Sequence, residues 1–331
     1  MSRIVLGLAT SHSPLLTFGA DVWTERAKDD VKMTALTLSD GRTLSYEELS
    51  AERGDRFAAE ATAKNFIRQD AAAQACLDRI ADELETARPD IVIIVGDDQE
   101  ELFGAGATPA IAIYHGEEMV MHPISLVRPN LPEWRKTASE GYRMDQPYRY
   151  PAAPDYARGL IERMIDAEVD LAVSSQVSDP HKAGFGHAYG FIVGRLFRGR
   201  EIPVVPLLLN TYYPPNVLSA DRCHEVGQRL RAAIEASPDD LRICVIASGG
   251  LSHFATDAEL DEGVMTALET ADAAHLRAIP RAALRSGSSE ILNWVLAAGS
   301  LEGLPLAWKD YIPVHRTPAG TGVGLGFACW R

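Results

Sequence analysis

The chain has 331 residues, a length that suits one large α/β domain or two smaller ones. Hydrophobic residues make up 46% and charged residues 24%, the balance of a globular protein with enough apolar side chains for a sizeable core. A formal net charge of −14 argues against nucleic acid as a partner, because contact with phosphates requires a basic surface.

The cysteines are far apart and form no Cys-x-x-Cys pair, so neither a structural zinc site nor a redox dithiol is expected. The apolar run near the N-terminus is too short for a signal peptide and leads directly into His12. No stretch reaches the roughly 18 apolar residues of a membrane span. We therefore expect a cytoplasmic protein that has no membrane partner.

Short apolar runs between turn residues predict strands, and apolar residues at helical spacing predict helices. In chain order these patterns predict a strand at 3–10, a helix at 56–87, strands at 91–95 and 109–114, a helix at 155–167, a strand at 169–175, a helix at 187–198, a strand at 203–209, a helix at 219–236, a strand at 242–248, helices at 257–277, 280–285 and 288–299, and a glycine-rich strand at 320–330.

Two long segments separate these elements. Residues 20–60 are charged and irregular in pattern, with an N-cap signal at Ser45 that acidic residues follow. Residues 122–154 are punctuated by prolines, and we expect this connection to be ordered by packing over a site.

Strands that alternate with helices predict an α/β fold with a mostly parallel or mixed central sheet. Ligands of such sheets bind beyond the carboxyl ends of the strands. Polar residues follow three of the predicted strands at that end: Ser11-His12, Asp97-Asp98-Gln99 and Ser252-His253.

Each histidine of interest permits two interpretations. A lone histidine at a strand end, such as His12, is more often structural than functional. His253 follows two glycines, whose tight turn would aim its side chain into a cleft. His187 opens a predicted helix, where it either packs structurally or serves a site as a neutral imidazole.

The acidic residues also leave alternatives open. The segment 97–101 is either a solvated loop, the interpretation that we favour for Glu100 and Glu101, or a site for a hard cation such as Mg²⁺. Glu290 lies among apolar residues of a predicted helix, where a buried carboxylate is costly unless it is paired or bound to a metal. A role at the start of that helix is the alternative.

Taken in order, these segments resemble the class III extradiol ring-cleavage dioxygenases of the protocatechuate 4,5-dioxygenase β-subunit type, across nearly the whole chain. The stretches that carry the resemblance are 10–14, 92–103, 170–197, 209–215, 248–253, 286–294 and the closing glycine-rich strand. The resemblance implies one α/β domain over 1–331, with a central mixed sheet flanked by helices and an insertion at about 20–60.

In that family a ferrous ion, Fe(II), is held by two histidines and one glutamate, with positions left open for a catechol and O2. The resemblance implies that His12 is the first histidine ligand and Glu290 the carboxylate ligand. It also implies that His253 is the base that takes a proton from a substrate hydroxyl. His187 resembles the second catalytic histidine, which contacts substrate or bound oxygen.

The chain departs from the family pattern where Asn-Asp-His is replaced by Asp97-Asp98-Gln99. We expect Gln99 to be the third metal ligand. An amide oxygen is a harder and weaker donor than imidazole, so affinity for Fe(II) should fall relative to Mg²⁺ or Mn²⁺. Asp98 is the alternative ligand if its loop turns inward.

Two further departures concern the substrate and a partner. Relatives carry a serine that contacts the substrate carboxylate where this chain has Thr321, so the Thr321 hydroxyl is the candidate replacement. The insertion at 20–60 is a candidate cover for the mouth of the pocket, a task that a small α-subunit performs in some relatives.

The leading hypothesis is an Fe(II)-dependent extradiol dioxygenase that uses O2 to cleave a catecholic or related hydroxylated aromatic compound. One alternative is a metal-dependent hydrolase or lyase on the same scaffold, which Gln99 favours. Another is a non-catalytic subunit that has lost its metal, and retention of the three histidines and Glu290 weighs against it. We also expect a homo-oligomer, with a small α-type subunit as a candidate partner.

Overall fold

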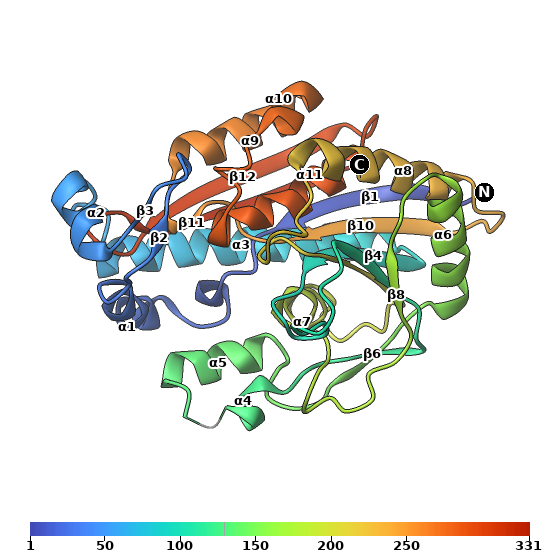
Figure 1. Ribbon diagram of the computed structural model, residues 1–331, viewed down its shortest axis with the longest axis horizontal. Coiled ribbons are helices and arrows are strands. Elements are labelled where there is room, and N and C mark those ends of the chain that lie inside the picture. The colour runs from blue at the N-terminus through green and yellow to red at the C-terminus, as the bar shows by residue number, and fades with distance from the viewer. Residues whose placement is uncertain (129) are drawn as a thin grey trace.

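The computed structural model describes residues 1–128 and 130–331 (Figure 1). Its centre is a mixed sheet that has nine strands among the described residues, in the spatial order β11-β13-β1-β10-β4-β9-β5-β8, with β12 paired to β13. These strands are β1 (Arg3–Thr10), β4 (Ile91–Asp97), β5 (Ile111–Tyr114), β8 (Ala172–Ser174), β9 (Val204–Leu209), β10 (Arg242–Ser248), β11 (His253–Ala255), β12 (Leu306–His315) and β13 (Thr321–Trp330).

The four strands β1, β10, β4 and β9 are parallel neighbours. Strands that are covered on both faces are apolar throughout, and β4 illustrates the reason. Its residues Ile91, Ile93 and Val95 belong to one hydrophobic core, whereas Val92 and Ile94 belong to the core on the other face. The α/β class and the mixed sheet predicted from the sequence are therefore confirmed.

Helices cover both faces of the sheet (Figure 1). One core is covered by α6 (Pro154–Asp166), α8 (Ala220–Glu235), α9 (Ala258–Thr270), α10 (Ala273–Ala278) and α11 (Ile291–Ser300). The other is covered by α3 (Ala63–Ala87), α7 (His187–Phe191) and the π-helix η2 (Ile192–Leu196). In the part of the chain that the structure describes, no helix combines the length and the apolarity needed to cross a bilayer.

The prediction that residues 20–60 are irregular is wrong. They form α1 (Ala20–Asp30), the strand pair β2 (Leu36–Thr37) and β3 (Thr43–Leu44), and α2 (Tyr46–Arg53). The N-cap signal at Ser45 is confirmed, because Ser45 and Glu48 form a reciprocal capping box at the start of α2. The apolar side chains that order this segment include the fully buried Trp23, Leu36 and Leu49.

The proline-punctuated connection contains α4 (Ile124–Val127), α5 (Glu133–Gly141) and β7 (Arg149–Pro151), and β7 pairs with β6 (Glu118–Val120), which precedes the connection. The helix predicted at 280–285 is wrong, since these residues form turns that lead into the 3-10 helix η3 (Ser286–Glu290). Strand β12 was not predicted, because Lys309 and Asp310 interrupt its apolar pattern. The short 3-10 helix η1 (Pro14–Leu16) follows β1.

Candidate metal centre

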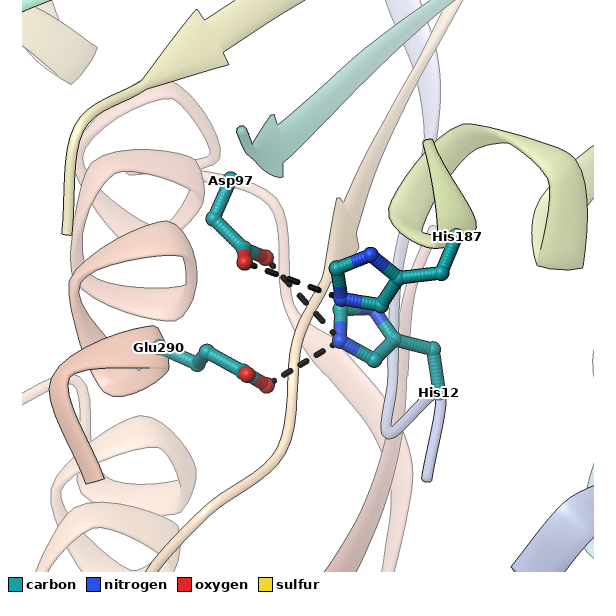
Figure 2. Close-up of side chains that lie close together, drawn as sticks. All are labelled: His12, Asp97, His187 and Glu290. Atoms are coloured by element: carbon teal, nitrogen blue, oxygen red, sulfur yellow. Dashed lines mark ion pairs between the residues drawn. The ribbon is translucent and has the colours of Figure 1, made fainter. Parts of the chain in front are cut away.

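Four side chains from distant parts of the chain converge beyond the carboxyl ends of the parallel strands (Figure 2). His12 follows β1, Asp97 ends β4, His187 opens α7 and Glu290 ends η3. One ligand atom from each lies within 4.8 Å of the others. Nε2 of His12 is 3.1 Å from Oε2 of Glu290 and 3.9 Å from Oδ1 of Asp97, and Nε2 of His187 is 3.8 Å from Oδ2 of Asp97.

The register of the sheet explains this convergence. Thr10 at the end of β1 is opposite Ser248 at the end of β10, and Ser248 is opposite Gly96 in β4. The three chains therefore leave the sheet side by side, and the residue that follows Gly96 is Asp97. Parallel strands that end together place their following polar residues at one edge, which is where ligands bind in such sheets.

His12 is held in the tautomer that a metal ligand requires. Its Nδ1 lies 3.0 Å from Oγ of Ser248, whose own hydroxyl proton is donated to the carbonyl of Ala188 at 2.6 Å. Ser248 can therefore only accept from His12, so the proton is on Nδ1 and Nε2 keeps its lone pair. Fixing the second ring nitrogen in this way is how proteins orient metal-binding histidines.

His187 is oriented by a buried carboxylate. Its Nδ1 donates to Oε1 of Glu101 at 2.6 Å. A Cβ at Gly186 would lie 2.1 Å from the Glu101 carboxyl carbon, so only glycine leaves room for this pair. Burial disfavours the charged imidazolium, but Glu101, Asp97 and Glu290 outweigh that effect and raise the pKa of His187 to about 10. The prediction that Glu101 is solvated is therefore wrong, whereas Glu100 is exposed as predicted.

His253 faces the same carboxylate as His12. Its Nδ1 donates to the carbonyl of Leu251 at 2.8 Å, and its Nε2 lies 3.3 Å from Oε1 of Glu290. A Cβ at Gly287 would lie 2.2 Å from the His253 ring, so this glycine permits the close packing. Burial lowers the pKa of His253, but Glu290 outweighs burial and the net direction is upward.

Asp97 and Glu290 are the two carboxylates of the four-residue cluster, and their environments shift their pKa values in opposite directions. Burial and the Glu290 carboxylate raise the pKa of Asp97. Burial also opposes ionisation of Glu290, but His253 and His12 outweigh it and hold the pKa of Glu290 well below its usual range. A divalent cation would displace the Nε2 proton of His187, and the neutral imidazoles of His12 and His187 with the two carboxylates would then form a donor set for that cation.

Gln99 lies at the centre of this group. Its amide nitrogen is 3.0 Å from Oδ2 of Asp97, 3.3 Å from Nε2 of His187 and 3.5 Å from Oε1 of Glu290. The neighbouring Asp98 turns away, because its carboxylate accepts hydrogen bonds from the backbone N–H groups of Leu102 and Phe103. Burial and the nearby Glu101 raise the pKa of Asp98 to about 7.

Residues 59–326 match the family described as the catalytic LigB subunit of aromatic ring-opening dioxygenase. The chain belongs to this family. The fold and the cluster agree with that membership, and His12 lies before the matched range. The resemblance inferred from the sequence is confirmed.

Curated relatives of this LigB family protein match over shorter segments. It is 42% identical over 52 residues to a gallate dioxygenase of Pseudomonas putida, which covers 16% of this chain and 15% of the relative. It is 31% identical over 103 residues to a 2,3-dihydroxyphenylpropionate/2,3-dihydroxicinnamic acid 1,2-dioxygenase of Burkholderia vietnamiensis, and 32% identical over 103 residues to that of Paraburkholderia phymatum. The latter matches each cover 31% of this chain and 30% of the relative, so the chain aligns with less than a third of these proteins.

The LigB family protein has a cavity of about 320 Å³ at the cluster, a size suited to a small molecule. The five residues predicted as metal ligands or catalytic groups line it: His12, Gln99, His187, His253 and Glu290. Asp97 lies behind this wall and is fully buried. The cavity is also lined by Tyr212, whose hydroxyl donates to Oε1 of Glu290 at 3.2 Å.

Sequence analysis did not select Asp97, Glu101 or Tyr212. The density of carboxylates at 97–101 was a signal for the first two, but their different roles depend on which way each side chain points in the loop. Tyr212 lies three residues after the predicted strand at 203–209. Because ligands bind beyond the carboxyl ends of such strands, Tyr212 could have been included among the candidates.

Proposed function

We propose that this chain is an Fe(II)-dependent extradiol dioxygenase that opens the ring of a catecholic or related hydroxylated aromatic compound with O2. The observation that carries the proposal is the histidine–carboxylate cluster at the wall of a cavity of small-molecule size. Membership in a family of ring-opening dioxygenase subunits supports the reaction class. The printed names of the gallate and dihydroxyphenylpropionate relatives support a hydroxylated aromatic substrate.

The donor set fits a ferrous ion, because two neutral imidazoles and a carboxylate are the ligands of facial-triad iron sites. We propose His12 and Glu290 as two ligands, with His187 and Asp97 completing the set. The Nδ1 hydrogen bonds of both histidines support this assignment, since each leaves Nε2 facing the cluster. The charges of Asp97 and Glu290 would offset that of one divalent cation, which lowers the cost of burying the ion.

The resemblance instead assigns the third ligand position to Gln99 and gives His187 a catalytic contact with substrate or oxygen, and both assignments stay predictions. Only an amide oxygen binds a metal, so Gln99 would have to turn its oxygen to where its nitrogen now faces three acceptors. Two variants separate the ligand sets. Gln99→Ala lowers iron affinity strongly only if the amide is a ligand, and Asp97→Asn does so only if that carboxylate is a ligand.

When bound, Fe(II) would supply the redox chemistry of ring opening and positions for the diol and dioxygen. His253 would accept the proton of a substrate hydroxyl at Nε2, because its Nδ1 proton is already donated to Leu251. The Tyr212 hydroxyl lies 3.5 Å from that nitrogen and would orient the same substrate hydroxyl. Trp134 and Tyr142 line the cavity and would exclude water from the aromatic ring.

Oxygen uptake by the iron-loaded protein tests the proposal. After anaerobic purification and addition of Fe(II), a panel of catechols, gallates and hydroxyquinols should include a substrate that takes up one O2 and gains two oxygen atoms in the ring-opened product. The His253→Gln variant should still bind iron, but its turnover should fall at least about 100-fold, because a general base typically accelerates a reaction by that factor or more. The matched control is His181→Gln, which alters an exposed histidine outside the cavity.

A different result would favour the hydrolase or lyase hypothesis. Firm binding of Mg²⁺ or Mn²⁺, combined with no oxygen uptake on any of these compounds, would contradict the dioxygenase proposal. The need for a small α-type subunit and the homo-oligomeric state stay predictions. Activity of the purified chain by itself would contradict the first, and a single-chain mass in solution would contradict the second.

A further inference from the structure

The cavity that holds the metal centre is also lined by three arginines. Arg26 comes from α1, Arg135 from α5 and Arg316 from the turn after β12. The chain as a whole carries a net charge of −14, whereas this wall of the cavity gathers three positively charged side chains. Local charge of the opposite sign to the rest of a protein indicates a specific electrostatic task.

The carboxylates beside these arginines balance only part of their charge. Asp30 is fully buried and pairs with Nη1 of Arg26 and, at 2.7 Å, with Nε of Arg316. Among the described residues, Arg135 has no carboxylate within ion-pair distance. Three guanidinium groups therefore share one buried carboxylate, which leaves an excess of two positive charges at this wall.

A second carboxylate nearby does not remove the excess. Asp29 accepts hydrogen bonds from the indole of Trp134 at 3.0 Å and from Lys32 at 3.1 Å, so another cation balances it. Burial, and after it the charge of Arg316, lower the pKa of Arg26 to about 10, although Asp30 and Asp29 oppose the change. The side chains of Arg26 and Arg316 are largely desolvated, and desolvated like charges are costly unless an anion joins them.

Two of the arginine side chains, those of Arg26 and Arg135, pack on Trp134, which also lines the cavity. The guanidinium of Arg26 lies 5.2 Å from the centre of the Trp134 ring, and that of Arg135 lies 5.1 Å from it. Contacts of this kind orient a guanidinium while leaving its N–H groups free to bind an anion. The guanidinium of Arg316 donates to Asp30 through Nε. Within the described residues its terminal N–H groups have no hydrogen-bond partner, so they are also available to an anion.

The Thr321 hydroxyl, which the sequence marked as a candidate contact for a substrate carboxylate, has a different partner. It is fully buried, is absent from the cavity wall and donates to Oδ2 of Asp30 at 2.9 Å. Thr321 thus fixes the carboxylate that holds Arg26 and Arg316. The group available for an anionic substituent is the set of arginines.

We propose that Arg26, Arg135 and Arg316 form a carboxylate subsite, so that the substrate is an aromatic acid whose diol faces the metal centre. The inference rests on the proposed function for the position of the diol. Its own basis is the excess positive charge on the wall that the arginines form, as distinct from the carboxylates of the metal centre in the same cavity. Arginine pairs with carboxylates through two parallel N–H groups, which fixes orientation as well as affinity.

Binding measurements test the subsite without requiring turnover. Calorimetric titrations under argon would compare 3,4-dihydroxybenzoate with its neutral analogue 3,4-dihydroxybenzamide. We expect the wild-type protein to bind the acid at least about tenfold more tightly, the size expected for one charge-assisted hydrogen bond. The preference should weaken as salt concentration rises, because the contact is ionic.

Arg135→Gln is the variant that should disturb the fold least. Arg135 is exposed, and among the described residues it forms no ion pair that the substitution would break. It should lower affinity for the acid by about tenfold and leave affinity for the amide near wild type, whereas Arg135→Lys should retain most of the preference. Arg26→Gln should act in the same direction. Lys136→Gln and Lys28→Gln remove the same charge from exposed positions on the same helices and should change neither affinity.

The outcomes separate this inference from the proposed function. Equal binding of acid and amide by the wild-type protein, or an unchanged preference in both arginine variants, would overturn the subsite even if oxygen uptake is observed. Conversely, an arginine-dependent preference for the acid in a protein that consumes no oxygen would support the subsite and overturn the dioxygenase proposal. Where turnover occurs, the loss in Arg135→Gln should appear as a raised KM for the acid.

Discussion

His12 and Glu290 come from opposite ends of the chain, yet Nε2 of the first lies 3.1 Å from Oε2 of the second. The same Glu290 oxygen accepts the backbone N–H of Gly250 at 2.6 Å, so the carboxylate is fixed before any ligand arrives. A rigid carboxylate beside a histidine of defined tautomer is a preformed site for a cation.

Glu290→Gln should therefore abolish stoichiometric binding of divalent metal, because the amide removes the negative charge and keeps nearly the same shape. Metal content after anaerobic loading, measured by mass spectrometry of the metal, checks this outcome. Glu302→Gln is the matched control, since Glu302 faces His224 at 3.5 Å outside the cavity. Full metal occupancy in the Glu290 variant would remove Glu290 from the ligand set.

Glu101→Gln should weaken metal binding by about 10- to 100-fold, the usual effect of losing a carboxylate behind a ligand histidine. Glu101 holds the Nδ1 proton of His187, and the neutral amide makes that imidazole a poorer donor. Titration with Mn²⁺ or Fe(II) measures the change. Glu100→Gln, one residue away and exposed, should bind metal like the wild type. Equal affinities in the two variants would mean that His187 is not a ligand.

Strand ends and a carboxylate among apolar residues made His12, His253 and Glu290 candidates, and the family resemblance then assigned them to the site. The roles of Asp97 and Glu101 were not visible. Which carboxylate of the segment 97–101 points into the cluster depends on the register of β4 against β10 and on the backbone bonds that turn Asp98 away. A local pattern cannot contain that information.

The same limit applies to the fold. The buried strand β10 was predicted at its exact bounds, because an apolar run on both faces has a strong signal. Strand β12 lies at the side of the sheet and mixes Lys309 and Asp310 with apolar residues, so its pairing with β13 provides the order that its own pattern lacks. Residues 20–60 are likewise ordered by long-range packing of Trp23 and Leu36.

Ser45→Ala should lower the free energy of unfolding by about 1 kcal/mol, the typical cost of removing an N-cap. Oγ of Ser45 accepts the N–H of Glu48 at 3.2 Å, and the Glu48 carboxylate returns to the Ser45 N–H at 2.7 Å. Urea unfolding measures the change. Ser50→Ala, inside the same helix, should leave stability unchanged or raise it slightly, since alanine favours helices. A loss in both variants would point to a cause other than the cap.

The pH dependence of stability should reveal Asp261, a fully buried carboxyl that accepts hydrogen bonds from Ser252. Burial raises its pKa to about 6, although hydrogen bonds from Ser252 and from Tyr311 oppose the rise. Because the folded-state pKa exceeds the unfolded value of 3.8, the contribution of Asp261 to stability is fully present below about pH 4 and is lost as pH rises through about 6.

The difference in unfolding free energy between the wild type and Asp261→Asn should therefore fall by roughly 3 kcal/mol between about pH 4 and pH 7, since one pKa unit corresponds to about 1.4 kcal/mol. Tyr311→Phe removes a hydrogen bond of 2.8 Å that stabilises the ionised form, so it should move the midpoint of this fall to higher pH. Denaturant unfolding at each pH measures both effects. A difference that stays constant over the range would show that Asp261 titrates alike in the folded and unfolded protein, and its burial would then carry no penalty for ionisation.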